Sequence, residues 1–398
     1  KMNINFVLPG TGIAGGIRVV FEYANRLSRR GHDVKVIYPV IPPRMDRKWT
    51  DYKTRITQFL GTVKRLIRGN SVDWFDVEVK LVPIPTVAPK TIPLARHFIP
   101  DADIIIATSW ETAYLVATLD ESKGKKAYFV QHYEIWQTWN DKDSWKKVEK
   151  LASEPHLYPI EMKEVTPTTE DTRREKELVD ESYNLPLSKI TISTWLMKLL
   201  ENKFDEEVVG VVPDSIDHDT FYYDPDQQPT SDSQTILLPF RNATWKGKNE
   251  VEELTEYLHS EYDVNIHVYG PSDAGNTIPG YVEYYHRPTD DELRKLYSNA
   301  DIFVYPSWVE GFGLPPLEAM ATKCAVVTTN TGRIKDFPAD TVASIVPPRD
   351  TAALIESTCN LIENSEKKER LQRSGYEYVQ QYSYEDATDK LENILMEL

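Results

Sequence analysis

Short apolar runs rich in β-branched residues alternate with amphipathic stretches along almost the whole chain. Apolar runs of this length, bounded by polar residues, predict buried strands. The predicted strands are Ile4–Leu8, Val34–Tyr38, Ile104–Thr108, Ala127–Val130, Ile190–Ser193, Ile236–Phe240, Asn265–Tyr269, Ile302–Tyr305 and Ala325–Thr328. Helical periodicity follows several of them, at Gly16–Arg30, Asn249–Tyr262 and Asp290–Ser298. This alternation predicts parallel sheets with helices on both faces.

The alternation is interrupted at Asp219–Ser233, a stretch rich in Asp, Pro, Ser and Gln that is typical of a linker. The chain is therefore expected to be an α/β protein with two Rossmann-like, doubly wound domains that face each other across a cleft. Ligands of such folds bind in the crevice at the carboxyl ends of the strands. The expected ranges are 1–215 for the N-terminal domain, 216–234 for the linker, 235–380 for the C-terminal domain and 381–398 for a final helix that packs back on the N-terminal domain or on its neighbour.

The composition of the chain argues against several classes of protein. The formal net charge of −16 over 398 residues argues against nucleic acid as a partner, because nucleic-acid binding requires a basic surface. The two cysteines, Cys324 and Cys359, are too few for a disulfide framework or a cysteine-rich metal site. No apolar run approaches the roughly 18–20 residues that a spanning helix needs. We expect a cytoplasmic protein.

A glycine-rich loop follows the first predicted strand. Gly10, Gly12 and Gly15 spell G-x-G-x-x-G, the dinucleotide fingerprint. A true dinucleotide site has an acid about 20 residues further on, whereas the second strand ends in Tyr38-Pro39-Val40, and NAD is therefore rejected. Gly15 and Gly16 still offer backbone N–H groups to an anion at a helix N-terminus. The alternative is a turn that needs glycine only for strand–helix packing, and the loop alone favours neither.

The segment SWVEGFGLPPLEAMA holds two glutamates, Glu310 and Glu318, at the start of a loop and in the following helix. Its glycines expose N–H groups that suit a diphosphate. Carboxylates beside a diphosphate make sense only if they accept hydrogen bonds from hydroxyls, such as a ribose diol and a sugar ring. Arg241 and Lys246, in the loop after another strand, supply the matching cations, since loops at the carboxyl ends of parallel strands converge.

The block EGFGLPPLEAMA resembles, nearly letter for letter, the E-x7-E motif of the retaining glycosyltransferases of family 4, which have the GT-B fold. The resemblance extends to GGIRVVFEYANRLSRRGHDV, to FRNATWKG and to Pro213-Asp214-Ser215-Ile216-Asp217 with Phe221, the family's P-N-G-V-D…F linker. The stretches YFVQHYE and ISTWL resemble the rhamnosyltransferase branch typified by WsaF. The sequence departs from the family at Asp214 and Ser215, where Asn-Gly is usual, and at Lys323 and Cys324.

The resemblance implies transfer of a hexose from a nucleoside-diphosphate sugar to a hydroxyl of a glycan, lipid-linked or other acceptor, with retention at the anomeric carbon. It implies that Glu318 holds the donor ribose and that Glu310 contacts hydroxyls of the transferred sugar. Arg241 and Lys246 would stabilise the leaving diphosphate, and no metal or cofactor would be needed. The remaining implied contacts with the donor are His132, Gly15, Gly16, Gly311, Phe312, Gly313 and Leu314.

Three further features have competing interpretations. The basic stretch Arg44–Arg68 predicts a helix that docks on an anionic membrane, or an ordinary helix with a solvated basic face. Aromatic residues Tyr133, Trp136, Trp139 and Trp145 would stack on acceptor sugars, or serve as packing residues. The pairs Asp101–Asp103 and Asp224–Asp226 match D-x-D, the metal-binding motif of the other main glycosyltransferase fold, but the first opens a strand and the second lies in the linker, so both are interpreted as solvated acids.

Two rival functions share the predicted nucleotide site. A sugar-nucleotide epimerase of the same fold would consume the donor without an acceptor. A non-catalytic nucleotide-sugar-binding protein would bind the donor without turnover.

Overall fold

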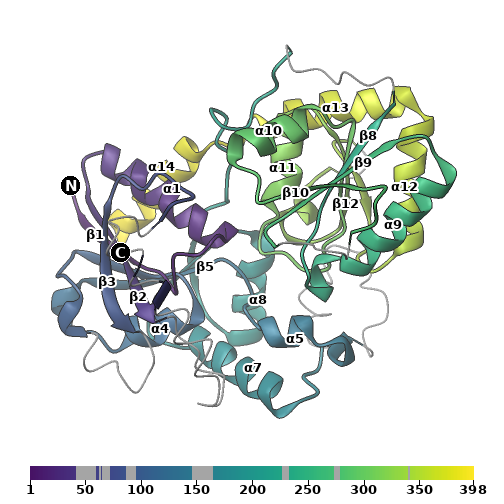
Figure 1. Cartoon of the computed structure of the whole chain (residues 1–398). Helices are drawn as coiled ribbons and strands as arrows, with labels where there is room; N and C mark the ends of the chain where they lie inside the picture. The colour runs from purple at the N-terminus through teal and green to yellow at the C-terminus, as the bar shows by residue number, and fades with distance from the viewer. Residues whose placement is uncertain are drawn as a thin grey trace. The chain divides into compact units, whose positions relative to one another are not determined.

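The structure is a computed structural model, and it describes residues 1–41, 60–61, 64, 72–86, 96–145, 165–225, 233–272, 278–338 and 341–398. The chain forms two compact units. The first unit comprises Lys1–Thr138, Pro167–Asp214 and Tyr384–Leu398. The second comprises Trp139–Thr166 and Ser215–Ser383. Figure 1 shows the sheet and the surrounding helices of each unit.

The first unit is built on a seven-stranded parallel sheet with the order β3-β2-β1-β4-β5-β6-β7. The central strand β1 pairs with β2 on one side and with β4 on the other, so that Phe6 lies beside both Val36 and Ile106. All three side chains are buried. The strands are β1 (Asn3–Val7), β2 (Asp33–Ile41), β3 (Lys80–Thr86), β4 (Ile104–Ala107), β5 (Lys125–Val130), β6 (Ser188–Thr191) and β7 (Val208–Val211).

Helices cover this sheet, and their starts follow from local sequence. Ser109 and Thr169 each accept a hydrogen bond from the backbone three residues later, which forms capping boxes at α4 and α7. The helices are α1 (Gly15–Arg29), η2 (Arg96–Phe98), α4 (Trp110–Ala117), η3 (Glu121–Lys123), α7 (Glu170–Tyr183), α8 (Thr194–Phe204) and α14 (Tyr384–Glu397). Two short elements lie where the chain passes into the second unit, α5 (Trp136–Asn140) and η4 (Lys142–Trp145).

The last helix, α14, packs against α1 in the first unit. Glu392 accepts hydrogen bonds from Arg30 at 2.9 Å and pairs with His32 Nε2 at 2.8 Å. Arg30 also contacts Asp389 at 2.6 Å. Tyr384 packs edge-on against Tyr23 with ring centroids 5.6 Å apart. The C-terminal residues therefore complete the unit that contains the N-terminus.

The second unit is built on a six-stranded parallel sheet with the order β10-β9-β8-β11-β12-β13. Its strands are β8 (Thr235–Pro239), β9 (Asn265–Gly270), β10 (Glu283–His286), β11 (Ile302–Tyr305), β12 (Ala325–Thr329) and β13 (Ser344–Val346). Its helices are η6 (Thr244–Lys246), α9 (Lys248–Glu261), α10 (Asp290–Ser298), α11 (Leu314–Ala321), η8 (Gly332–Asp336), α12 (Thr351–Glu363) and α13 (Ser365–Val379). Helices α9 and α12 contact each other, and α11 contacts both α10 and α13.

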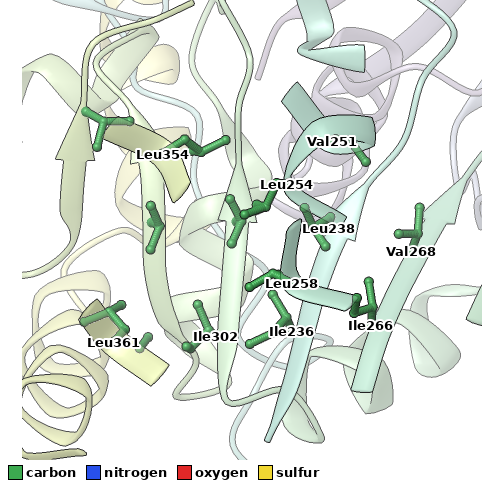
Figure 2. Close-up of a cluster of buried hydrophobic side chains, with 14 of the residues drawn as sticks. Ile236, Leu238, Val251, Leu254, Leu258, Ile266, Val268, Ile302, Leu354 and Leu361 are labelled. Atoms are coloured by element: carbon green, nitrogen blue, oxygen red, sulfur yellow. The ribbon is translucent and has the colours of Figure 1, made fainter. Parts of the chain in front are cut away.

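The core on one face of this sheet is entirely aliphatic where Figure 2 shows it. Leu254 and Leu258 of α9 and Leu354 of α12 lie over Ile236 and Ile302 of the neighbouring strands β8 and β11. All five side chains are at most 1% exposed. Burial of this apolar surface holds α9 and α12 on the sheet.

Truncation of one of these side chains tests the packing. We expect Leu254→Ala to lower the free energy of unfolding by about 2–5 kcal/mol, because it removes buried methyl groups and leaves a cavity. Urea denaturation followed by circular dichroism measures this loss. Glu256→Ala, on the exposed face of the same helix, is the matched control and is expected to change stability by less than about 0.5 kcal/mol. Equal losses in the two variants would contradict the assignment of this core.

All the predicted strands are present, and four further strands were not predicted. β3 contains Pro83 and Pro85, which suit an edge strand but weaken its signal. β7 contains Gly210 at an irregular register with β6. β10 is rich in tyrosine, and β13 spans only three residues. All four are edge strands: β3 and β7 lie at the two ends of the first sheet, and β10 and β13 lie at the two ends of the second.

Candidate functional site

In the second unit the candidate residues lie in loops that follow adjacent strands. Arg241 and Lys246 follow β8, and Glu310 lies between β11 and α11. Because β8 and β11 are parallel neighbours, these loops leave the sheet at the same edge. The structure thereby brings Lys246 and Glu310 into contact although 64 residues separate them.

Glu310 is buried and its carboxylate is held by three donors. Lys246 Nζ donates to Oε1 at 2.5 Å, Ser307 Oγ at 2.6 Å and Tyr305 Oη at 2.7 Å. Burial raises the pKa of Glu310, but the charge of Lys246 and these hydrogen bonds outweigh burial and hold the pKa below its ordinary value. Glu310 is therefore ionised at neutral pH and serves as a hydrogen-bond acceptor.

Lys246 is the cationic partner of this pair. Its ammonium also lies 4.2 Å from the centroid of the Trp245 ring. Burial lowers the pKa of Lys246, the Glu310 carboxylate opposes that effect, and the charge of Arg241 adds to the lowering. Arg241 is exposed, and its guanidinium makes no hydrogen bond or ion pair with the residues that the structure describes. Since Glu310 already neutralises Lys246, Arg241 contributes most of the uncompensated positive charge here.

Glu318 lies one turn into α11, at the end of a chain of hydroxyl groups. Tyr297 Oη donates to Glu318 Oε2 at 3.1 Å, and Tyr269 Oη lies 2.8 Å from Tyr297 Oη. Burial and the nearby carboxylate raise the pKa of both tyrosines, so their protons remain available for these bonds. Tyr269 also lies within electrostatic range of Arg241. These hydrogen bonds from residues of α10 and β9 hold the Glu318 carboxylate in one orientation.

Two glycines allow the loops to approach so closely. Gly247 has a φ of +77°, and a Cβ there would collide with the carbonyl oxygen of Pro306. Gly332, at the start of η8, has a φ of +55°, and a Cβ there would lie 2.5 Å from Phe312 O and 3.0 Å from Glu310 Cβ. Arg333 N donates to Phe312 O at 2.8 Å. The backbone of Gly332 and Arg333, which follows β12, thus packs against the loop 310–313 and holds it in place.

The predicted donor residues of this loop lie at the start of α11. Gly311 and Phe312 are buried, Gly313 caps the helix with a φ of +96°, and Leu314 is its first residue. No side chain caps this N-terminus. Backbone N–H groups and the helix dipole make such a terminus favourable for an anion.

In the first unit, α1 begins at Gly15, with Ala14 as an N-cap residue that makes no side-chain hydrogen bond. A Cβ at Gly15 would meet no atom within 4 Å, so packing does not require glycine there. A Cβ at Gly16 would lie 3.1 Å from Gln131 Oε1, the residue before His132. The structure therefore brings the glycine loop and the predicted histidine together within one unit.

His132 is 8% exposed and lies against Trp136, with ring centroids 4.6 Å apart. Its Nδ1 is 2.9 Å from the Tyr133 carbonyl oxygen, which can only accept. Nδ1 therefore carries the proton, and in the neutral ring Nε2 is the nitrogen with the lone pair.

The aromatic-cluster hypothesis is wrong for three of its four residues. Tyr133 and Trp139 are completely buried, and Trp145 is 2% exposed, so none of them can stack on a sugar. Trp145 instead packs edge-on against Trp308 at 5.1 Å between ring centroids. Only Trp136 is partly exposed.

The acidic pairs have structural partners. Asp101 pairs with Lys123 at 2.8 Å, and Asp103 accepts from Asn3 N at 2.6 Å. Asp224 lies 3.7 Å from Arg294, while Asp226 lies outside the described residues. The basic stretch Arg44–Arg68 also lies outside them except for three positions, and membrane docking stays a prediction. Within the described part of the chain, no helix is long and apolar enough to cross a bilayer.

Sequence reasoning missed Tyr305, Ser307 and Tyr297, the hydroxyl donors to the two glutamates. A signal was present for the first two, because both lie at the carboxyl end of a predicted strand, where functional side chains collect. Tyr297 gives no such signal, since it lies on a helix and its hydroxyl reaches Glu318 only in the folded unit.

Comparison with solved structures identifies the class of fold. The chain aligns over its full length with the crystal structure of Anabaena Alr3699/HepE in complex with UDP and glucose, with a TM-score of 0.68, 13% identity and 100% of both chains covered. It aligns equally fully with sucrose-phosphate synthase from Thermosynechococcus elongatus, with a TM-score of 0.67, 14% identity and 99% of that chain covered. Two parallel-sheet Rossmann-like units with these neighbours define the GT-B fold of glycosyltransferases.

Residues 276–378 match the family Glycosyl transferases group 1. The chain is 32% identical to O-antigen chain mannosyltransferase B of Escherichia coli over 117 residues, which are 29% of this chain and 30% of that protein. It is 32% identical to sulfoquinovosyl transferase SQD2 of Arabidopsis thaliana over 107 residues, 26% of this chain and 21% of that protein. The chain thus spans less than a third of each relative. These relatives support the glycosyltransferase class and do not single out the WsaF-type branch, which stays a prediction.

Proposed function

We propose that the chain is a retaining glycosyltransferase of the family 4 type, which transfers a hexose from a nucleoside-diphosphate sugar to a hydroxyl of a glycan or lipid-linked acceptor. The observation that carries the proposal is the ionised Glu310 held against Lys246, with Arg241 nearby and the uncapped start of α11 in the same loop. This set combines a hydrogen-bond acceptor for sugar hydroxyls with positive groups for a diphosphate.

In this proposal, Arg241, Lys246 and the N–H groups at the start of α11 stabilise the negative charge that develops on the diphosphate as the glycosidic bond breaks. Arg241 suits two phosphate oxygens at once, whereas Lys246 acts as a point charge. Glu318 accepts hydrogen bonds from the ribose, and Glu310 accepts one from the transferred sugar. The acceptor hydroxyl attacks from the face that the diphosphate leaves. These cations replace a metal ion in this scheme, and metal independence stays a prediction.

Residues of the first unit have supporting roles in this proposal. Gly15 and Gly16 offer backbone N–H groups to the diphosphate from the uncapped start of α1. His132, with Nε2 as acceptor, contacts a hydroxyl of the donor sugar. The half-buried Trp136 beside it offers an apolar ring face to a sugar.

The proposal is tested by incubating the protein with nucleoside-diphosphate mannose or UDP-glucose, with and without glycan acceptors, and by measuring release of the nucleoside diphosphate. Release that requires an acceptor supports transfer, and the anomeric proton signal of the product reports retention. Donor consumption without an acceptor would favour an epimerase. A rise in melting temperature with donor but no turnover would favour a binding protein.

Arg241→Ala tests the diphosphate role. We expect it to weaken binding of the nucleoside diphosphate by about tenfold, since a hydrogen-bonded charge of this kind contributes about 1.5–3 kcal/mol. The dissociation constant should also depend less on salt than in the wild type. Isothermal titration calorimetry at two ionic strengths measures both effects. Arg370→Ala on the solvent-facing side of α13 is the control, and an equal loss there would contradict the role of Arg241.

A further inference from the structure

Two hydroxyl groups that the proposed mechanism does not use converge on Glu310. Tyr305 is the last residue of β11, and Ser307 lies two residues later in the loop. Both side chains are buried, at 6% and 1% exposure. Both donate to the same carboxylate oxygen, Oε1, to which Lys246 also donates.

The distribution of these bonds over the two carboxylate oxygens is uneven. Each carboxylate oxygen offers about two lone-pair sites, so three donors saturate Oε1. Oε2 receives no hydrogen bond from any residue in the described ranges. We infer that Tyr305 and Ser307 are positioning residues that occupy Oε1 and reserve Oε2 of Glu310 for a hydroxyl of the transferred sugar. This inference rests on the proposed function.

The two hydroxyl donors are themselves fixed, so they hold the carboxylate in one orientation. Ser307 is held through its backbone, because its carbonyl oxygen accepts from Thr329 Oγ1 and the N–H of the next residue, Trp308, donates to Trp245 O at 2.8 Å. The Tyr305 ring stacks on Phe303, with an angle of 23° between the planes. Because Tyr305 and Ser307 are held in place, rotation of the Glu310 carboxylate would break the hydrogen bonds that both donate to Oε1.

Tyr305→Phe removes one donor and keeps the ring. We expect it to lower kcat for sugar transfer by about tenfold, because a hydrogen bond to a charged group is among the stronger ones. The affinity for the nucleoside diphosphate, which has no sugar, should stay within about twofold of the wild type. Ser307→Ala should show the same pattern, and it serves where Tyr305→Phe folds poorly.

A donor analogue makes the test specific. We expect the wild type to transfer slowly from a deoxy-sugar donor that lacks the hydroxyl bound by Oε2. With this donor, Tyr305→Phe should lower kcat by less than about a further twofold. Such non-additivity is typical of groups that act on one interaction. With deoxy donors that lack a different hydroxyl, Tyr305→Phe should still lower kcat by about tenfold.

Tyr128→Phe is the matched control, because Tyr128 is also buried and donates to a carboxylate, Glu134, in the first unit. It should leave kcat within about twofold. Equal loss of kcat in Tyr128→Phe, or an additive effect with every deoxy donor, would overturn the inference and leave the proposed function standing. A wild-type protein that neither binds nor transfers a nucleotide sugar would overturn both.

Discussion

Glu310→Gln is expected to lower the rate of sugar transfer by about a thousandfold, a loss typical of removing one preorganised electrostatic contact at a reacting centre. The amide keeps the shape of the side chain but removes the charge that pairs with Lys246 at 2.5 Å. It also places an N–H₂ group where a carboxylate oxygen accepts hydrogen bonds. Steady-state release of nucleoside diphosphate in the presence of acceptor measures the loss.

The stability of Glu310→Gln must be measured beside its activity. Loss of the carboxylate leaves Lys246, whose side chain is 17% exposed, without its ionic partner, and the melting temperature should fall. Glu256→Gln, on the exposed face of α9, is the matched control and should match the wild type in both properties. A Glu310→Gln protein that transfers sugar at more than a tenth of the wild-type rate would contradict the role of Glu310.

Gly332→Ala is expected to reduce transfer by about a hundredfold, although Gly332 carries no side chain for any ligand. An added Cβ would lie 2.5 Å from Phe312 O and 3.0 Å from Glu310 Cβ, so the loop that carries Glu310 must move. A displacement of about 1 Å in a catalytic group can cost about a hundredfold in rate. The positive φ of +55° adds strain of about 1 kcal/mol for an alanine.

Gly280→Ala is the control that separates displacement of the Glu310 loop from the general effect of replacing a glycine with alanine. Gly280 is in the same unit, has no positive φ, and an added Cβ there meets nothing within 4 Å. Its activity and melting temperature should equal those of the wild type. If Gly332→Ala retained wild-type activity, the loop 310–313 would not need the support of η8.

Much of the fold could be predicted because most strands of both sheets are buried on both faces. Such strands appear in the sequence as short continuous runs of β-branched and other apolar residues, without alternating polar positions. Ile104–Ala107 and Ile302–Tyr305 are such strands, and both are fully buried. The Lys246–Glu310 pair could be anticipated from topology, since adjacent parallel strands deliver their loops to one edge. Strands at sheet edges, such as β3 with its two prolines, lack this signal because one side is unpaired.

The details of the site could not be predicted, because they depend on which oxygen or ring another element brings close. The sequence gives no indication that Tyr305 and Ser307 converge on one oxygen of Glu310, or that Tyr297 on α10 reaches Glu318. Trp139 and Trp145 are of a residue type that stacks on sugars. In the folded unit they pack against each other, and Trp145 also packs against Trp308, so neither ring reaches solvent. Exposure is a property of the folded unit and not of the residue type.

The position of α14 on α1 has a consequence for biosynthesis. Arg30 and His32 leave the ribosome about 360 residues before their partners Asp389 and Glu392. During synthesis, the face of α1 that contacts α14 therefore stays uncovered until residues 384–398 have been made. A stop codon before residue 384 would therefore leave α1 without the helix that packs against it, although the two helices are encoded far apart.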